Sequence, residues 1–251
     1  MIQSIAENIR QIHEEVNILA KVFQGTNVGK VRQNNEDALI VIEPETFVVA
    51  DGMGGASAGE VASQMLIETV KSFLSRSPAP WDEKILSQAI LLANDKILNR
   101  ARLNEEYRGM GTTATILSLY GGKAYFAHVG DSRLYLLREN YFAQITEDHS
   151  YVETLVRSGE ITHEEARLHP MRNVLTQAVG AMPELEIDAA NFSVASGDIF
   201  LLCTDGLTNM VEDELIAKIL LGAPNPADAL IEAALSAGGK DNISVIVAGV
   251  D

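Results

Sequence analysis

The chain has 251 residues, of which 47% are hydrophobic, and its formal net charge at pH 7 is −16. This length suits one large domain, and the acidic charge argues against nucleic-acid and anionic-membrane binding, which need clustered lysine and arginine. No stretch approaches the roughly 18 apolar residues of a membrane span, and the first residues lack the pattern of a secretory signal. The single cysteine, Cys203, lies in an apolar run and excludes a disulfide within the chain, so we expect a reducing, cytoplasmic location.

The N-terminal residues differ in pattern from the rest of the chain. Apolar side chains recur three and four residues apart between Ile2 and Leu19, which predicts an amphipathic helix with a narrow apolar seam. We therefore separate a helical extension, residues 1–20, from a main domain, residues 21–251. Because so short a helix is marginal in water, its seam is expected to pack on the domain, on a second copy or on a regulatory protein.

The main domain is predicted to alternate strands with two pairs of helices. Runs of β-branched and aromatic residues bounded by turn residues predict strands, and apolar side chains at helical spacing predict helices. A proline-containing break at residues 77–80 divides the first helical region into an antiparallel pair. The predicted strands are 21–24, 38–42, 47–50, 112–119, 123–129, 133–138, 141–145, 192–194, 199–203 and 243–250, and the predicted helices are 57–76, 82–103, 212–221 and 226–237.

One segment, residues 147–180, is polar and irregular, with two short helical stretches. Long loops in compact domains are usually functional, so this segment is expected to cross over a site. The overall order of strands, helix pair, strands, helix pair and strand favours an α+β fold, with antiparallel sheets and helices layered outside them.

Acidic clusters are the most informative feature of the chain, because most of them follow an apolar run. Asp51 comes directly after the predicted strand 47–50, and Asp205 follows the predicted strand 199–203. Carboxylates can converge from distant strand ends only if a cation offsets their repulsion, and Mg²⁺ and Mn²⁺ prefer oxygen ligands. The sequence therefore predicts a metal centre that activates water. The clusters contain Glu36 and Asp37, Asp51, Asp131, Asp205, and Asp241.

Other motif matches point to different chemistry and are disfavoured. Residues 55–59 match the G-x-S-x-G nucleophile elbow, but several residues separate them from the strand and no histidine follows His169. The same glycines resemble a dinucleotide-binding loop, but Asp51 would repel a pyrophosphate there. His163 and His169 are six residues apart, which does not fit the HExxH spacing of zinc proteases.

The chain resembles the metal-dependent (PPM, type 2C) protein phosphatases, and it resembles their bacterial branch most. The match covers about residues 21–250. The resemblance implies a central antiparallel β-sandwich flanked on both sides by pairs of antiparallel helices, a four-layer αββα arrangement with a flap near the metal site. The motifs that carry it, in chain order, are residues 31–38, 51–55, 109–113, 129–133, 148–150, 172–176, 204–207 and 241–244.

The resemblance also implies metal ligands at matching positions. Asp51 is expected to bridge two Mn²⁺ or Mg²⁺ ions, and the Gly52 carbonyl is expected to bind one of them. Asp205 and Asp241 are expected to bind the other ion. Asp131 would hold a third, weaker ion that it shares with Asp205.

Further roles are implied around these ligands. Glu36 and Asp37 match an outer acidic pair that acts through water, and Arg32 matches the arginine that grips substrate phosphate, a task that suits its planar donor group. Met53 departs from many eukaryotic members, which carry at this position a histidine proposed to protonate the leaving alkoxide. A thioether cannot donate a proton, so that step must differ here.

The resemblance implies a protein phosphatase that hydrolyses phosphoserine and phosphothreonine. A hydroxide that bridges two metals would attack in line, and phosphorylated Ser/Thr proteins would be the substrates. A bacterial Ser/Thr kinase is the expected opposing enzyme. Two alternatives stay open: a catalytically silent phosphoprotein-binding relative, and a hydrolase of small phosphorylated metabolites. The presence of every expected aspartate disfavours the first, and a shallow site with a flap would disfavour the second.

Overall fold

The computed structural model describes residues 19–43, 45–54 and 58–251. The helix expected at residues 2–19 lies outside these ranges, except that Leu19 is the first residue of a strand. The strands are β1 (Leu19–Asn27), β2 (Asp37–Ile42), β3 (Thr46–Met53), β4 (Gly111–Thr112), β5 (Ala114–Tyr120), β6 (Lys123–Val129), β7 (Arg133–Arg138), β8 (Tyr141–Gln144), β9 (Asp188–Ser193), β10 (Ile199–Cys203) and β11 (Ile243–Val250). The helices are α2 (Ala58–Leu74), α3 (Glu83–Leu103), the 3₁₀ helix η1 (Glu105–Tyr107), α4 (Tyr151–Arg157), α5 (His163–Leu168), α6 (Asp205–Thr208), α7 (Asp213–Gly222) and α8 (Pro226–Ser236).

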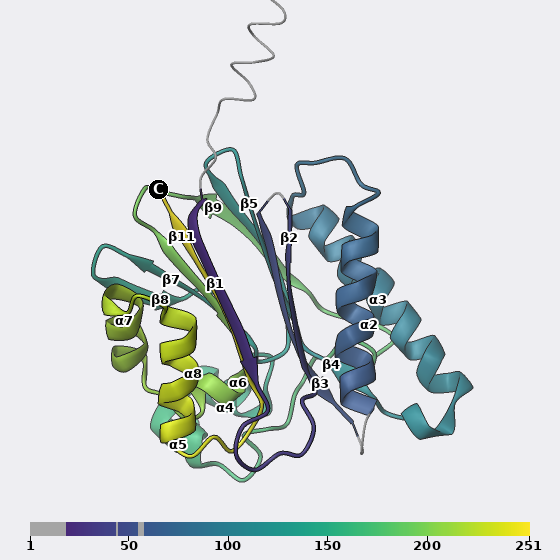
Figure 1. Cartoon of the computed structure of the whole chain (residues 1–251). Coiled ribbons are helices and arrows are strands. Elements are labelled where there is room, and N and C mark those ends of the chain that lie inside the picture. The colour runs from purple at the N-terminus through teal and green to yellow at the C-terminus, as the bar shows by residue number, and fades with distance from the viewer. Residues whose placement is uncertain (1–18, 44, 55–57) are drawn as a thin grey trace, which may run out of the picture.

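Two antiparallel sheets pack face to face in the middle of the molecule (Figure 1). The β1 sheet has the strand order β1-β11-β10-β7-β8, and the β2 sheet has the order β2-β3-β5-β6-β9, with the short β4 paired to β3. Helices α2 and α3 cover the outer face of the β2 sheet, and α7 and α8 cover that of the β1 sheet. The structure confirms the predicted α+β fold with four layers.

Central strands are buried on both faces, which explains their continuous apolar sequences. In β3, Phe47 and Val49 belong to the core between the sheets, whereas Val48 and Ala50 belong to the core beneath α2 and α3. Side chains alternate between the two faces of a strand, so a strand in a middle layer needs apolar residues at every position. Cys203, in β10, is completely buried in the same manner on the side of α7 and α8.

Strands β1, β3 and β9 are longer than the sequence pattern predicts, and β3 continues past its apolar run to Met53. Strand β1 extends to Asn27 because its backbone pairs with β11 along its whole length, as far as Asn27 opposite Ile243. Strand β9 begins at Asp188, four residues earlier than expected, and its side chains are mostly exposed. It is the edge strand of the β2 sheet, held by its ladder with β6, so it carries little apolar signal.

The flap, residues 147–180, contains the short helices α4 and α5 and is closed at its base by backbone pairing. The Tyr151 amide donates to the Val174 carbonyl (2.8 Å), and the Thr176 amide donates to the His149 carbonyl (2.8 Å). In Figure 1, α4, α5 and α6 lie together at the lower end of the sandwich, where several strands end. The flap therefore stands beside these strand ends.

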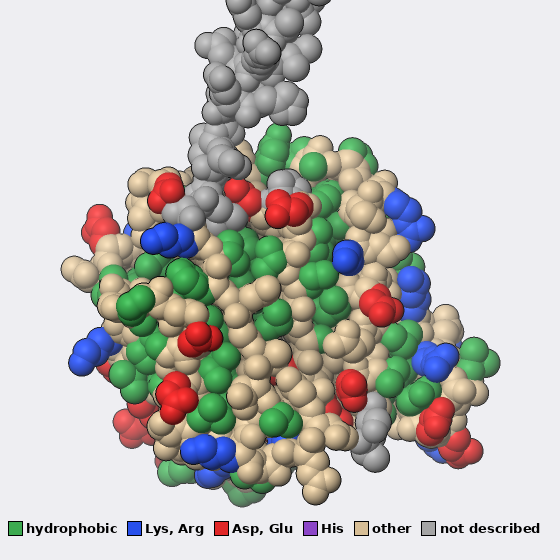
Figure 2. All heavy atoms as spheres, viewed as in Figure 1, with side chains coloured by type: hydrophobic (Ala, Val, Ile, Leu, Met, Phe, Trp, Pro, Cys, Tyr) green, Lys and Arg blue, Asp and Glu red, His purple; other side chains and the backbone are tan. Residues whose placement is uncertain are grey.

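Acidic residues outnumber basic ones, 35 to 19. In Figure 2 the acidic side chains are spread over the visible face and are interspersed with lysine and arginine. Much of the negative charge on this face therefore lies on the general surface, where it favours solubility. Among the described residues, no helix is long and apolar enough to cross a membrane.

Replacement of Phe47 by alanine is expected to destabilise the domain strongly. Its side chain is completely buried between the two sheets, so truncation leaves a cavity that costs about 3–5 kcal/mol of unfolding free energy. Denaturant unfolding followed by circular dichroism measures this loss. As the control, Tyr141→Ala should change the free energy by less than about 0.5 kcal/mol, because 74% of the Tyr141 surface is exposed. Equal losses in both variants would contradict the assigned core.

Candidate metal centre

Carboxylates from both sheets meet at the strand ends beside the flap. Asp51 lies near the end of β3, and Asp131 lies in the turn between β6 and β7. Asp205 is the first residue of α6, shortly after β10, and Asp241 lies just before β11. All four line one cavity of about 200 Å³. The other lining residues are Arg32, Glu36, Gly52, Met53, Gly54, Thr113, Asn173, Leu175 and Asn242.

Thr113 fixes the backbone of Asp51 and links it to the Asp131 turn. The Asp51 amide donates to Thr113 Oγ1 (2.9 Å), and the Thr113 amide donates to the Asp51 carbonyl (2.9 Å). Thr113 Oγ1 also shares a 2.6 Å hydrogen bond with Ser132 Oγ. Because Ser132 follows Asp131 directly, one threonine sets the relative positions of two cavity carboxylates.

Gly52 allows three segments to approach closely at the cavity floor. A Cβ atom on Gly52 would lie 2.1 Å from the Gly59 carbonyl oxygen and 2.5 Å from the Glu36 carbonyl oxygen. The Gly52 amide also donates to that Glu36 carbonyl (3.1 Å). Only glycine fits here, since any side chain would push α2 and the Glu36 segment away from Asp51.

Asn242 holds the loop that carries Arg32 and Glu36. Its Nδ2 donates to the Val28 and Asn34 carbonyls (both 2.9 Å), and its Oδ1 accepts from the Glu36 amide (2.8 Å). The loop is thereby tied beside Asp241. Arg32 completes the link, because its Nη2 lies 2.8 Å from Asp241 Oδ2 at the mouth of the cavity.

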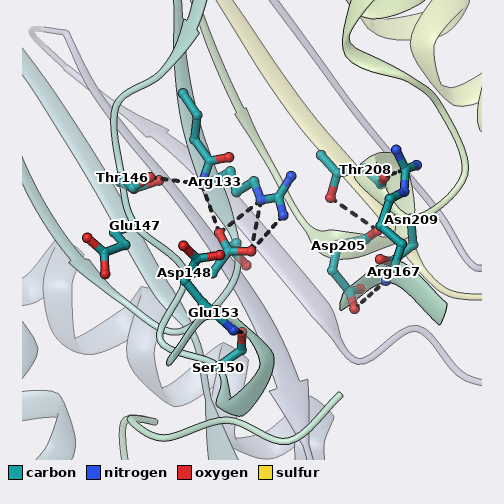
Figure 3. A network of polar contacts seen from close by, with 12 residues as sticks. Arg133, Thr146, Glu147, Asp148, Ser150, Glu153, Arg167, Asp205, Thr208 and Asn209 are labelled. Carbon is teal, nitrogen blue, oxygen red and sulfur yellow. Dashed lines mark hydrogen bonds and ion pairs between the residues drawn. The ribbon is translucent and has the colours of Figure 1, made fainter. Parts of the chain in front are cut away.

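An ion pair between Arg133 and Asp148 supports the Asp131 side of the cavity (Figure 3). Arg133 Nε and Nη2 both donate to the Asp148 carboxylate, and the shortest of these contacts is 2.6 Å. Desolvation and the neighbouring charges of Asp205 and Asp148 raise the pKa of Asp131 well above its usual value, and Arg133 partly offsets this. The ion pair therefore places one fixed positive charge near the acidic cluster and joins β7 to the flap base.

Burial and mutual repulsion raise the pKa values of the carboxyl groups in and beside the cavity. Desolvation raises the pKa of Asp205 to about 6 and that of Asp37 to about 7, and nearby carboxylates add to both shifts. The pKa of Asp51 is raised well above its usual value, first by desolvation. Further contributions to the Asp51 shift come from Asp37, Asp205, Asp131 and Asp241. A cation in the cavity would reverse these effects, because it favours the charged carboxylates.

Two buried carboxylate oxygens support a cation site directly. Asp205 Oδ2 accepts from Asn209 Nδ2 (2.9 Å) and Asp37 Oδ2 accepts from Thr204 Oγ1 (2.9 Å), whereas Oδ1 of each aspartate has no hydrogen-bond partner. Buried polar atoms are rarely left unsatisfied, so these oxygens point to a missing electropositive partner. The donors are oxygens, which suits Mg²⁺ or Mn²⁺. Among the described residues, no three acidic, histidine or cysteine side chains lie close enough to surround one ion on their own, so water and backbone oxygens would complete its coordination.

Comparison with known proteins decides the family. Residues 24–232 match the family model described as Protein phosphatase 2C. The chain belongs to the protein phosphatase 2C family. The sequence motifs resembled this family of serine/threonine protein phosphatases, so the predicted family is confirmed.

Bacterial serine/threonine phosphatases are among the relatives of this chain. The serine/threonine phosphatase stp of Listeria welshimeri is 40% identical over 233 residues, and the alignment covers 88% of this chain and 92% of the relative. The serine/threonine protein phosphatase PstP of Mycobacterium tuberculosis is 38% identical over 238 residues, and the alignment covers 94% of this chain. The chain spans 46% of that longer relative.

A solved relative carries metal ions. The crystal structure of the catalytic domain of PstP in complex with two manganese ions is 36% identical to this phosphatase, with a TM-score of 0.85. The superposition covers 93% of this chain and 99% of that structure. The fold of the two proteins is therefore the same.

The expected site residues of this phosphatase lie together, with one exception. Arg32, Glu36 and Gly52 line the cavity with the four aspartates described above. Asp37 does not line the cavity; it is buried to 6% exposure, and the β2–β3 pairing places it opposite Asp51. Glu36 and Asp37 are therefore not an equivalent pair, because only Glu36 faces the cavity.

Several cavity residues received no role from the sequence. Thr113, Asn173, Leu175 and Asn242 line the cavity, although all of them lie inside motifs that resemble the family. Their position within those motifs was the available signal. Their roles depend on contacts with distant residues, such as Asn242 with Val28, which sequence spacing does not reveal.

Replacement of Asp51 by asparagine is expected to abolish the thermal stabilisation caused by Mn²⁺. A ligand at one hundred times its Kd contributes about 2.7 kcal/mol, which corresponds to a rise of roughly 5–10 °C in the Tm of the wild type. Without metal, the variant should be at least as stable as the wild type, because asparagine is neutral and removes the repulsion between Asp51 and the neighbouring carboxylates. Thermal melts with Mn²⁺ and with EDTA test both statements. A variant that keeps the full Mn²⁺ shift would remove Asp51 from the metal centre.

Proposed function

We propose that this phosphatase hydrolyses phosphoserine and phosphothreonine in proteins and that its activity depends on Mn²⁺ or Mg²⁺. The observation that carries the proposal is the cavity that four aspartates and two glycines line together with a single, half-exposed arginine. Among the described residues that line the cavity, Arg32 is the only lysine or arginine. A cavity lined by carboxylates and one arginine suits a site in which bound metal ions, together with that arginine, hold the phosphoryl group and neutralise its charge.

Asp51, Asp205, Asp241 and the Gly52 carbonyl would hold two ions, and Asp131 would hold a third with Asp205. When bound, such ions supply an activated water for in-line attack on phosphorus and neutralise the phosphoryl charge. The manganese ions in the PstP catalytic domain support this assignment. The unsatisfied Oδ1 of Asp205 supports it from the chain itself.

Arg32 would bind the substrate phosphate. A guanidinium has five N–H donors, so Arg32 can keep its contact with Asp241 and still present donors to two phosphate oxygens. Half of the Arg32 side chain is exposed (51%), which allows it to meet an incoming substrate. Its ion pair with Asp241 also orients it toward the carboxylates before substrate arrives.

Met53 lines the cavity and carries no transferable proton. The proton that the leaving serine or threonine oxygen needs would therefore come from water inside the cavity. The described side chains at position 53 and at the neighbouring Thr113 provide no acid of suitable pKa.

Protein substrates fit the cavity better than whole metabolites. A volume of about 200 Å³ is below the 300–1,000 Å³ typical of pockets that enclose small-molecule ligands. It suits a phosphorylated side chain, with the rest of the substrate lying outside. The complete set of aspartates also argues against a silent phosphoprotein-binding relative. A bacterial Ser/Thr kinase would phosphorylate the substrate proteins. The buried Cys203 suits a location in a reducing cytoplasm.

The test of this proposal is hydrolysis of a phosphothreonine peptide with Mn²⁺, with Mg²⁺ and with EDTA. Release of phosphate should require a divalent ion and stop when EDTA is in excess. Equal rates with and without metal would overturn the metal-dependent mechanism. Absence of turnover with both ions, together with tight peptide binding, would support the silent relative instead.

Replacement of Arg32 by alanine is expected to raise the KM for the peptide by about 10-fold or more, because a charge-assisted contact with phosphate is lost. Part of the loss should also appear in kcat, since phosphoryl charge changes in the transition state. Arg102→Ala is the matched control, because Arg102 is exposed and does not line the cavity. An unchanged KM for Arg32→Ala would remove Arg32 from the phosphate site.

Deletion of residues 1–18 is expected to leave peptide hydrolysis largely intact, since the cavity residues all come from the main domain. The deletion must stop before Leu19, because β1 begins there and pairs with the end of β11. A lower Tm after deletion would indicate that the extension packs on the domain, and loss of a dimer in light scattering would indicate self-association. A large loss of kcat would contradict the division of the chain.

A further inference from the structure

A single arginine connects the flap to the helices that carry Asp205. Arg167, in α5, donates through Nη1 to the Glu212 carboxylate and through Nη2 to the Thr208 carbonyl (3.4 Å), as Figure 3 shows for Arg167 and Thr208. Thr208 is the last residue of α6, and Glu212 is the N-cap of α7. This contact therefore reaches from the middle of the flap to the opposite wall of the site.

The anchor of Arg167 is the same turn that orients Asp205. The side chain of Asn209 donates to Asp205 Oδ2 (2.9 Å), and the Asn209 amide donates to the Asp205 carbonyl (2.8 Å). Asn209 follows Thr208 directly, so the carbonyl that accepts from Arg167 belongs to the peptide bond that carries the Asn209 amide. The flap and a cavity carboxylate thus share one short piece of backbone.

On the other side, a compact chain of turns joins Arg167 to the cavity wall. The Arg172 amide donates to the His169 carbonyl (3.1 Å), and the Val174 amide donates to the Met171 carbonyl (3.1 Å). These turns lead from the end of α5 to Asn173 and Leu175, which line the cavity. A shift of α5 would therefore move this wall, because the hydrogen-bonded turns between α5 and residues 173–175 are short.

The other ion pairs of the flap do not make this connection. Arg157 pairs with Glu147, and both residues belong to the flap itself. Arg133 pairs with Asp148, and this contact holds the base of the flap. Of the ion pairs described for the flap, only that of Arg167 joins its outer helices to the α6–α7 region.

We propose that Arg167 is a positioning residue that holds the flap against the α6–α7 turn and keeps the Asn173–Leu175 wall in place for a phosphorylated protein segment. The proposal rests on the proposed protein phosphatase activity. The ion pair is exposed, with 45% of the Arg167 side chain and 66% of the Glu212 side chain accessible. Exposed ion pairs are weak, so the contact favours the flap position seen in the structure and still lets the flap move for bulky substrates.

The effect should depend on the size of the substrate. A phosphothreonine peptide extends beyond the cavity and reaches the flap, so its KM should rise about 2- to 5-fold in Arg167→Ala, as expected for an exposed pair. A small aryl phosphate such as p-nitrophenyl phosphate meets only the Asn173–Leu175 wall of the flap, whereas the peptide also extends over its outer part, so the KM and kcat of the aryl phosphate should change less than 2-fold. This split separates flap positioning from damage to the metal centre.

A double-mutant cycle identifies the partner. Arg167→Ala, Glu212→Ala and the double variant are compared by peptide KM and by hydrogen exchange of flap amides at residues 151–173. The two single changes should each raise KM and speed exchange, and the double change should add little to either single one. Arg157→Ala is the matched control, because it removes an exposed flap arginine whose partner lies within the flap.

The outcomes are distinct. An unchanged peptide KM and unchanged flap exchange in Arg167→Ala would overturn the proposal, as would an equal rise in Arg157→Ala. Fully additive effects of Arg167→Ala and Glu212→Ala would also overturn it. If the wild type does not hydrolyse phosphopeptides at all, the proposed function fails, but the exchange measurement still decides whether Arg167 holds the flap.

Discussion

Mutual repulsion among carboxylates is the constraint on which the rest of this site depends. Asp51, Asp131, Asp205 and Asp241 share one small cavity, and neighbouring carboxylates contribute to the raised pKa of Asp51. Such an arrangement persists only if the surrounding structure holds each group firmly and a cation supplies the missing attraction. The hydrogen bonds of Thr113 and Asn242 provide the first condition, because they fix backbone segments and not flexible side chains.

The double sheet makes this arrangement possible. The cavity aspartates come from β3 in one sheet, from α6 after β10 in the other, and from the connections that lead into β7 and β11. Strand ends in the middle layers are rigid because both of their faces are packed. The flap adds the adaptable part, and its exposed ion pair contrasts with the buried anchors around Asp51. In the proposed function, catalysis would therefore depend on the rigid strand ends, and recognition of the substrate would depend on the flap.

Much of the fold was predictable from the sequence, because burial on both faces gives the central strands a continuous apolar pattern. The edge strand β9 was predicted too short, since its side chains are exposed and only its backbone ladder defines it. Asp51 and Asp205 were predictable from their place after apolar runs, whereas Asp241 follows two glycines and a lysine and was identified from the family motif. Thr113 and Asn242 were not, because their roles arise from contacts between residues far apart in the chain. The burial of Asp37 opposite Asp51 depends on strand register in the same way.

The buried cysteine has a practical consequence for experiments on the flap. Burial raises the pKa of the Cys203 thiol to about 12, so almost none of it is the reactive thiolate at neutral pH. A cysteine introduced on the surface of α5 would therefore be the one thiol that ordinary maleimide labels reach. Spectroscopic probes can be attached there without first replacing the native residue. The distribution of flap positions can then be measured in the otherwise unaltered chain.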